Sequence, residues 1–145
     1  MVLEAVWLLS QVERFYLTAE LKVVSAFQLN LSFIMDRIKK SADFKLVSRL
    51  GKKWISDSFI MLILKREEDS SPLRLGLTVS RKVGNAVKRN RVKRRFRALM
   101  RLYAPQDELS GFDIVLIGRT AAIEKDFLLM KKDLLWCFKR LELIK

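Results

Sequence analysis

The apolar positions of residues 35–145 change period several times, and each period predicts a different element. A continuous apolar run of strand length occupies residues 59–64, with Trp54-Ile55 as a short lead-in, and residues 112–117 are expected to form another strand. From Leu73 to Val79, apolar residues alternate with small or polar ones, which predicts a strand with one buried and one solvent-accessible face. The chain therefore contains two or three strands before residue 80 and another near its last third.

Three other segments repeat apolar residues at helical spacing. Ser41 is placed to cap a short helix that runs to about Leu50 and ends at Gly51. A second helix is expected from Ala86 to about Tyr103, and a third from about Glu124 to Leu143. The apolar stripe of the third consists of Phe127, Met130, Leu134, Phe138 and Leu141. This order of elements predicts an α+β or α/β sandwich, in which helices pack on a small sheet.

Residues 1–34 differ in kind from the rest of the chain. They carry a net charge of −1, whereas residues 35–145 carry +14. Their longest uncharged run, Val23 to Met35, has 13 residues and is too short to span a membrane. We expect a domain at 35–145 that follows an N-terminal extension at 1–34. The extension is interpreted as weakly ordered or as the product of a mis-assigned start; an extra helix packed on the domain is the alternative.

The formal charge of +13 and a sequence pI near 10.2 favour a polyanionic partner, nucleic acid rather than an acidic membrane surface. The charge is concentrated: residues 74–106 hold eleven Lys or Arg and no Asp or Glu. The absence of histidine excludes His-dependent catalysis and His metal ligands. A single cysteine, Cys137, excludes a disulfide within the chain and fits a reducing cytoplasm.

The helix expected at 86–103 has two chemically distinct sides. Val92, Phe96, Leu99 and Tyr103 form a stripe that we expect to be buried. Asn90, Arg94, Arg97 and Arg101 lie on the opposite side, and Arg91, Lys93 and Arg95 lie on the flanks. Surface helices usually mix charges of both signs, because i,i+4 acid–base pairs stabilise them. A wholly basic surface therefore indicates phosphate binding through bidentate guanidinium contacts more than an ordinary solvated face.

The turn before this helix adds a candidate phosphate site. Gly84 permits a positive φ there, and Asn85 is placed to cap the helix, whose first amides then point toward Arg81, Lys82 and Lys88. An ordinary loop glycine is the alternative for Gly84. Phe44, in the first helix, is either an exposed ring on which a nucleotide stacks or a core residue.

The segment V-G-N-A-V-K-R-N-R-V-K-R-R-F-R, which follows a strand ending T-V-S-R-K, resembles the signature of the bacterial ribonuclease P protein subunit. Its core is Arg89-Asn90-Arg91, followed by Lys93, Arg94 and Arg97. The resemblance runs from about Met35 to the C-terminus and leaves out residues 1–34. This motif is long and specific.

The resemblance implies an α+β fold, namely an α-β sandwich with a small mixed sheet and a left-handed β-α-β crossover through the basic helix. It implies an endoribonuclease subunit that binds the catalytic RNA and the 5′ leader of precursor tRNA, and assists hydrolytic removal of that leader. The implied RNA-binding residues are Arg81, Lys82, Asn85, Lys88, Arg89, Asn90, Arg91, Lys93, Arg94, Arg97 and Arg101. A cleft between the first helix and the sheet, with Phe44, Ser80 and Lys82, would hold the leader.

On the same resemblance the catalytic groups and Mg²⁺ would belong to the RNA, so that no catalytic or metal-binding residue, protein partner or membrane contact is expected of this chain. The chain departs from the family pattern at Ser48, where a second aromatic is frequent, and at Ala98, where Glu is frequent. A structural RNA-binding protein, such as a ribosomal protein, is the rival interpretation. A helix-turn-helix protein is disfavoured, because the basic helix lies between two strands.

Overall fold

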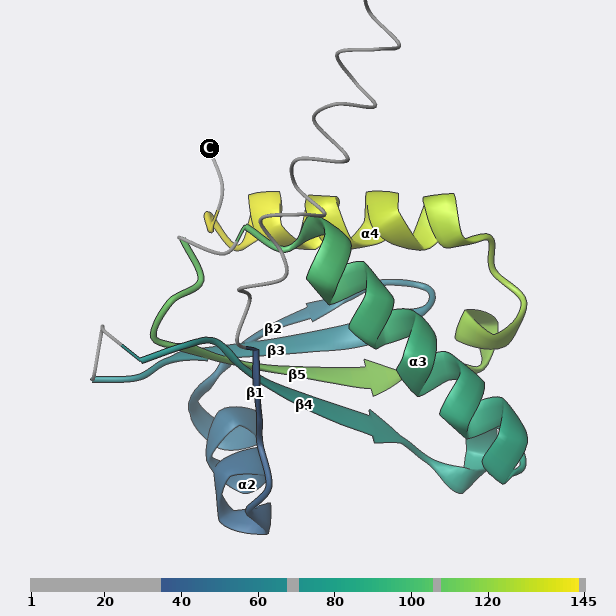
Figure 1. Cartoon of the computed structure of the whole chain (residues 1–145), viewed down its shortest axis with the longest axis horizontal. Helices are drawn as coiled ribbons and strands as arrows, with labels where there is room; N and C mark the ends of the chain where they lie inside the picture. Colours follow the sequence, from purple (N-terminus) through teal and green to yellow (C-terminus); the bar gives the residue numbers. More distant parts are fainter. Residues whose placement is uncertain (1–34, 68–70, 106–107, 144–145) are drawn as a thin grey trace, which may run out of the picture. The chain divides into compact units, whose positions relative to one another are not determined.

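The computed structural model describes residues 35–67, 71–105 and 108–143 (Figure 1). Its strands are β1 (Asp36–Arg37), β2 (Lys52–Ile55), β3 (Phe59–Lys65), β4 (Arg74–Val79) and β5 (Phe112–Gly118). Its helices are α2 (Ser41–Leu50), α3 (Ala86–Tyr103) and α4 (Phe127–Arg140), with short 3₁₀ helices η2 (Arg81–Val83) and η3 (Thr120–Ile123). All belong to one compact unit, Ile34–Lys145. The extension predicted at 1–34 lies outside the described residues.

The strands form one mixed sheet in the order β1-β4-β5-β3-β2. Strands β1, β4 and β5 are parallel to one another, whereas β3 runs antiparallel to both β5 and β2. The small mixed sheet of the predicted α+β sandwich is therefore confirmed. Helix α3 connects the parallel neighbours β4 and β5; the left hand of that crossover stays a prediction.

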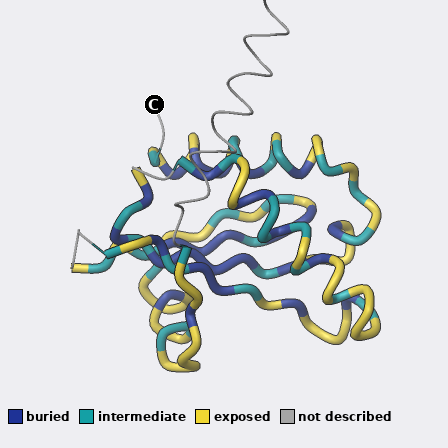
Figure 2. The backbone as a smooth tube through the Cα atoms, in the orientation of Figure 1, coloured by how far each residue is buried: buried dark blue, intermediate teal, exposed yellow. Residues whose placement is uncertain are grey.

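Helices α3 and α4 cover one face of the sheet, and the short α2 covers part of the other (Figure 1). On the first face Phe59 of β3 meets Phe96 of α3, with ring centroids 5.7 Å apart. On the second face Val47 of α2 packs with the sheet residues Leu62 and Val115. The central strands are thus covered on both sides, which explains why β3 is apolar from Phe59 to Leu64 and why β5 is apolar apart from Asp113 and Gly118. Figure 2 shows mainly buried backbone along the central strands and exposed residues on the helices.

The sequence interpretation missed strand β1 and recognised only the end of strand β2. Trp54-Ile55 is not a lead-in but part of β2, an edge strand paired with β3. The two charged residues of β1 carry no apolar pattern, yet the chain around them pairs with β4 through Asp36 N to Leu73 O at 2.9 Å and Ile38 N to Leu75 O at 3.1 Å. Such pairing depends on a distant strand and leaves no local signal.

The predicted helix ends are partly wrong. Ser41 is the first helical residue of α2 rather than its cap; Lys40 holds the N-cap position without a side-chain hydrogen bond. Gly51 does end α2, and a Cβ there would collide with the carbonyl oxygens of Val47 and Ile63. Helix α4 begins later than predicted, at Phe127, because the Asp126 side chain caps it by accepting from Leu128 N at 3.2 Å.

The expected exposure along β4 is also only half right. Thr78 is exposed, but Gly76, on the same side of the strand, is buried. The cause is Phe44, whose ring lies against the Gly76 backbone: a Cβ on Gly76 would lie 2.6 Å from Phe44 Cε1. Helix α2 therefore covers the first half of this strand and leaves the second half open.

Candidate nucleic-acid interface

Helix α3 begins and packs as its sequence predicts. The Asn85 side chain accepts a hydrogen bond from Lys88 N at 3.0 Å, and Gly84 takes a positive φ of 156° immediately before it. Both predictions for this turn are confirmed, since only glycine adopts that φ without strain. The buried side of α3 consists of Val92, Phe96, Leu99 and Met100, while Tyr103, expected in this stripe, is half-buried.

The other side of α3 is positively charged and not neutralised. Lys88, Asn90, Arg91, Arg94 and Arg101 are exposed, and Arg89, Lys93 and Arg97 are half-buried. In the described ranges, none of these cations forms an ion pair with a carboxylate; the ion pairs found there involve Arg66, Arg74 and Lys125. Apart from Arg89, whose Nε is buried, guanidinium groups without protein partners keep their donors for an external anion.

Arg95 differs from its neighbours. It was placed on a flank of the charged surface, but its Nη1 donates to the carbonyl oxygens of Ala122 at 2.8 Å and Ile123 at 3.1 Å, and its Nη2 donates to that of Lys125. Burial, and then the nearby charge of Arg91, lower the pKa of this guanidinium from its ordinary value. Arg95 therefore joins α3 to η3 and the residues that follow it.

Arg74 is likewise an internal cation. Its Nε donates to Asp113 Oδ1 at 2.7 Å, and its Nη1 lies 3.3 Å from Asp43 Oδ2. The carboxylate of Asp113 is buried, and its hydrogen bond to Arg74 raises the pKa of that guanidinium. The network joins β4 and β5 to Asp43, the residue before Phe44, so it fixes the part of α2 that carries the candidate stacking ring.

The residues predicted to hold an RNA leader lie in two hollows rather than one. Ser80 and Lys82 are exposed and line a hollow at the ends of β4 and β5, together with Arg119 and Thr120. Phe44 lines a different groove, at the β1 edge of the sheet. Gly76, Thr78 and Ser80 follow one another on one side of the chain, so the two places are roughly 13 Å apart at an extended rise of about 3.3 Å per residue.

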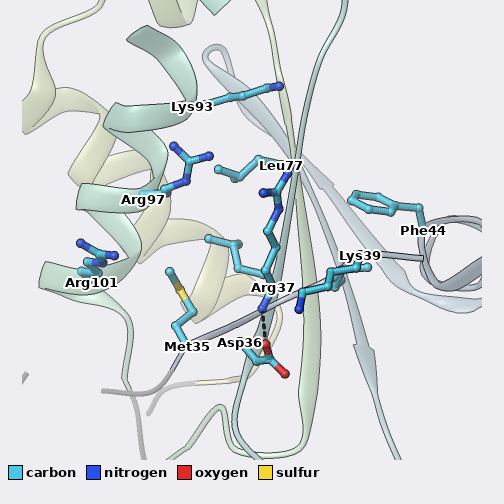
Figure 3. A pocket seen from close by; sticks show the side chains of 11 residues that line it. Met35, Asp36, Arg37, Lys39, Phe44, Leu77, Lys93, Arg97 and Arg101 are labelled. Atoms are coloured by element: carbon cyan, nitrogen blue, oxygen red, sulfur yellow. Dashed lines mark hydrogen bonds between the residues drawn. The ribbon is translucent and has the colours of Figure 1, made fainter. Parts of the chain in front are cut away.

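The groove at the β1 edge is bordered by cations from two elements (Figure 3). Lys93, Arg97 and Arg101 extend from α3 on one side, and Arg37 and Lys39 come from the β1 segment on the other. Its volume is about 520 Å³, and its floor includes Leu75 and Leu77. The sequence interpretation missed Arg37 and Lys39, although the D-R-I-K-K cluster at 36–40 was a visible signal.

The remaining candidate groups for chemistry are the carboxylates and the one thiol, Cys137. In the part of the chain that the structure describes, no cluster of three or more His, Cys, Asp or Glu side chains could hold a metal ion. Cys137 is buried, and that burial raises the pKa of its thiol to about 12, so the reactive thiolate is not populated near neutral pH. None of the described helices is long and apolar enough to cross a membrane.

A mixed α-β sandwich with a basic helix surface and a cationic groove at one sheet edge has the features of a nucleic-acid-binding protein of the α+β class. The sequence profile of the family described as Ribonuclease P matches residues 35–142. The chain is 39% identical over 109 residues to the ribonuclease P protein component of Paramagnetospirillum magneticum, covering 73% of this chain and 82% of that one. It is 41% identical over 105 residues to that of Bacillus cereus, covering 72% and 89%. The chain belongs to the ribonuclease P protein family.

Solved structures agree with this assignment. The RNase P protein of Staphylococcus aureus is 30% identical, with a TM-score of 0.64 over 75% of this chain and 97% of that one. The RNase P protein of Thermotoga maritima is 34% identical, with a TM-score of 0.60 over 72% and 96%. The family inferred from the R-N-R motif is confirmed, and with it the role of the protein component of ribonuclease P in tRNA 5′ processing.

Proposed function

We propose that the exposed side of α3 and the turn through η2 bind the ribonuclease P RNA. The observation that carries this assignment is the set of cations on α3 that no carboxylate in the described residues neutralises. The exposed members are Lys88, Arg91, Arg94 and Arg101, with Arg81 and Lys82 before the helix. Arg95, which bonds to carbonyl oxygens within the protein, is left out of this surface.

The 5′ leader of precursor tRNA is assigned to the open part of the sheet face beside α2. Phe44 supplies a partly exposed ring at one end, and Ser80 and Lys82 supply polar and cationic groups at the other. Thr78 lies between them and is exposed. Because the two ends are roughly 13 Å apart at about 3.3 Å per residue, a leader of several unpaired nucleotides is needed to reach both.

The bond-breaking groups are assigned to the RNA, with Mg²⁺ held there. The described part of the protein offers no metal cluster, and α3 has no carboxylate to ligate a cation. Bound by RNA, Mg²⁺ supplies activated water for hydrolysis of the phosphodiester. The protein's own residues bind and orient the RNA and reduce the repulsion between RNA strands. The cytoplasm, where bacterial tRNA precursors are made, is the assigned location.

The deciding experiment is cleavage of precursor tRNA by ribonuclease P RNA at low Mg²⁺, with and without the protein. Addition of the chain is expected to raise the cleavage rate, and Arg91→Ala with Arg94→Ala is expected to remove most of that gain. Arg49→Gln, which removes an exposed cation from α2, is the matched control. If the chain binds the RNA and leaves the cleavage rate unchanged, it is a structural RNA-binding protein and the proposal is wrong.

A further inference from the structure

An aromatic surface lies at the β2 edge of the sheet, the edge opposite β1 and the Phe44 groove. Trp54 on β2 and Trp136 on α4 meet in a T-shaped pair with ring centroids 5.0 Å apart. The guanidinium carbon of Arg140 lies 4.9 Å from the centroid of the Trp136 ring. Trp136 nevertheless remains 47% exposed. A large ring that the core covers only by half is a common feature of a binding surface.

The charges around this tryptophan pair are mostly positive, with Glu142 as the acidic residue that shares a hollow with Lys52. Lys132, Lys139 and Arg140 are exposed and lie three or four residues from Trp136, so they share its side of α4. Lys52 adds an exposed cation from β2 and faces the same side of the sheet as Trp54, two residues away.

Two nearby carboxylates are already paired. Asp133 accepts a hydrogen bond from Lys125 Nζ at 2.6 Å and another from Ser58 Oγ at 3.1 Å. Asp57 lies 3.6 Å from the same lysine. These two acids therefore offset Lys125, and the cations beside Trp136 keep their charge for an external group.

We propose that Trp54, Trp136, Lys52, Lys132, Lys139 and Arg140 form a second RNA-binding site, in which an unpaired base stacks on Trp136 and the cations contact the flanking phosphates. Stacking on an aromatic ring accepts every base, and basic residues around the ring follow the backbone. A second copy of this chain is a poor occupant, because two chains of formal charge +13 would bring positive surfaces together.

This site is separate from the α3 surface. Helix α3 packs over β4 and β5 and against α4, whereas the tryptophan pair lies where α4 meets β2. RNA bound at the tryptophan pair therefore occupies a different part of the sandwich from RNA bound along α3. The protein holds two RNA segments at once, and loss of one site leaves the other in place.

The first test follows the fluorescence of Trp136. The full chain with Trp7→Phe and Trp54→Phe retains Trp136 as its single tryptophan. Titration with oligouridine RNA is expected to quench its emission and to reach saturation, because a stacked base contacts the indole directly. No quenching, in a chain whose circular dichroism shows it to be folded, would overturn the proposal.

The second test measures affinity for oligouridine in a background that carries Arg91→Ala and Arg94→Ala, which weakens the α3 surface. Trp136→Ala is expected to lower the remaining affinity about fivefold or more. Leu128→Ala removes a 61% exposed apolar side chain from the same helix and is expected to change nothing. Trp136→Phe keeps a ring and is expected to retain most of the affinity. Arg140→Gln is expected to reduce the salt dependence, with Arg49→Gln as the control.

Equal affinities of the Trp136→Ala and Leu128→Ala chains would contradict a stacking site. Sedimentation of the free protein provides the other decisive result. If it shows a concentration-dependent dimer that Trp136→Ala abolishes, the surface joins two copies of the chain and the RNA assignment is wrong. Cleavage stimulation through α3 is measured separately, so failure here leaves the ribonuclease P role untouched.

Discussion

Arg94 and Arg95 are adjacent on α3, yet the structure gives them different tasks. Arg94 is exposed and makes no ion pair among the described residues, whereas Arg95 donates to the carbonyl oxygens of Ala122, Ile123 and Lys125. Those carbonyls belong to η3 and the residues after it, which precede α4. Arg95 therefore serves packing, whereas Arg94 is left exposed for the proposed contact with RNA, although both are part of the same basic run.

Exchange of either arginine for glutamine separates the two roles. Arg95→Gln is expected to lower the free energy of unfolding by about 1.5–3 kcal/mol, the range for hydrogen bonds to a charged group, and to leave the salt dependence of RNA binding nearly unchanged. Arg94→Gln is expected to do the reverse. Thermal melting and RNA titration on both variants check this. If both variants melt like the parent chain, the carbonyl contacts of Arg95 contribute nothing to stability.

The sequence left two alternatives for Phe44, an exposed stacking ring or a buried core residue. Its burial in the structure is intermediate between them. Its ring is half-buried and packs against the cluster around Leu62 and Val115, and its edge lies on Gly76. The ring therefore packs on the sheet, and its exposed part is the surface on which the proposed stacking would take place.

Substitution of Phe44 is expected to affect precursor tRNA selectively. Phe44→Ala should weaken precursor binding by about 1–3 kcal/mol through lost stacking, because only the precursor has an unpaired leader. It should also cost stability, but less than the about 3–5 kcal/mol of a fully buried phenylalanine. Phe44→Leu should keep much of the stability and still lose the selectivity. Affinities for precursor and mature tRNA, measured beside the melting temperature, decide the matter.

Val47→Ala is the control for Phe44, because Val47 is fully buried in the same cluster and has no exposed ring. It should lower the melting temperature without changing the ratio of the two tRNA affinities. An equal loss of precursor and mature tRNA binding in the Phe44→Leu chain would show that Phe44 is only a core residue.

At the scale of the element, one side of α3 packs on the sheet while the opposite side is exposed to solvent. The Asn85 cap and the buried side around Val92, Phe96 and Leu99 fix the helix on the sheet. Cations of the same sign repel one another along the remaining surface, which costs stability in the free protein and is relieved when phosphates bind. The free energy of RNA binding should therefore depend strongly on salt.

That dependence can be measured residue by residue. Arg91→Ala and Arg94→Ala should each weaken binding to ribonuclease P RNA and lower the slope of log affinity against log salt by about 1 for each lost phosphate contact. Leu102→Ala, on the same helix, removes an exposed apolar side chain and should leave the slope as it is. Unchanged slopes in both arginine variants would mean that this side of α3 does not face RNA.

At the scale of the whole molecule, charge and family boundaries coincide. The ribonuclease P profile begins at residue 35, and residues 35–145 carry the net charge of +14, while residues 1–34 carry −1. The sheet, both apolar layers and the basic helix are complete within the described residues. The RNA-binding domain is accordingly proposed to comprise residues 35–145.

Removal of residues 1–34 is therefore expected to leave RNA affinity and cleavage stimulation unchanged. The melting temperature should also stay close to that of the full chain, because the deleted part adds no cation surplus to the RNA surface. Calorimetry and RNA titration of the shortened and full chains provide the comparison. A large drop in either quantity would show that the extension belongs to the domain.

The amino-acid sequence by itself determined the elements whose causes are local. Helix α3 matches its predicted bounds of 86–103, because its cap, its preceding glycine and its apolar spacing all lie within the segment. Strands β3 and β5 were also predicted from sequence, since strands covered on both faces are mostly apolar. The R-N-R motif then identified the family from contiguous residues.

Only the tertiary structure decided what depends on distant partners. The pairing of β1 with β4, the carbonyl contacts of Arg95 and the burial of Gly76 under Phe44 each join residues from separate elements. So does the tryptophan pair of β2 and α4. Hydrophobic period and capping report which side of an element is buried, but not which neighbour covers it. Only the assembled elements therefore show which arginines bond within the protein and which stay exposed.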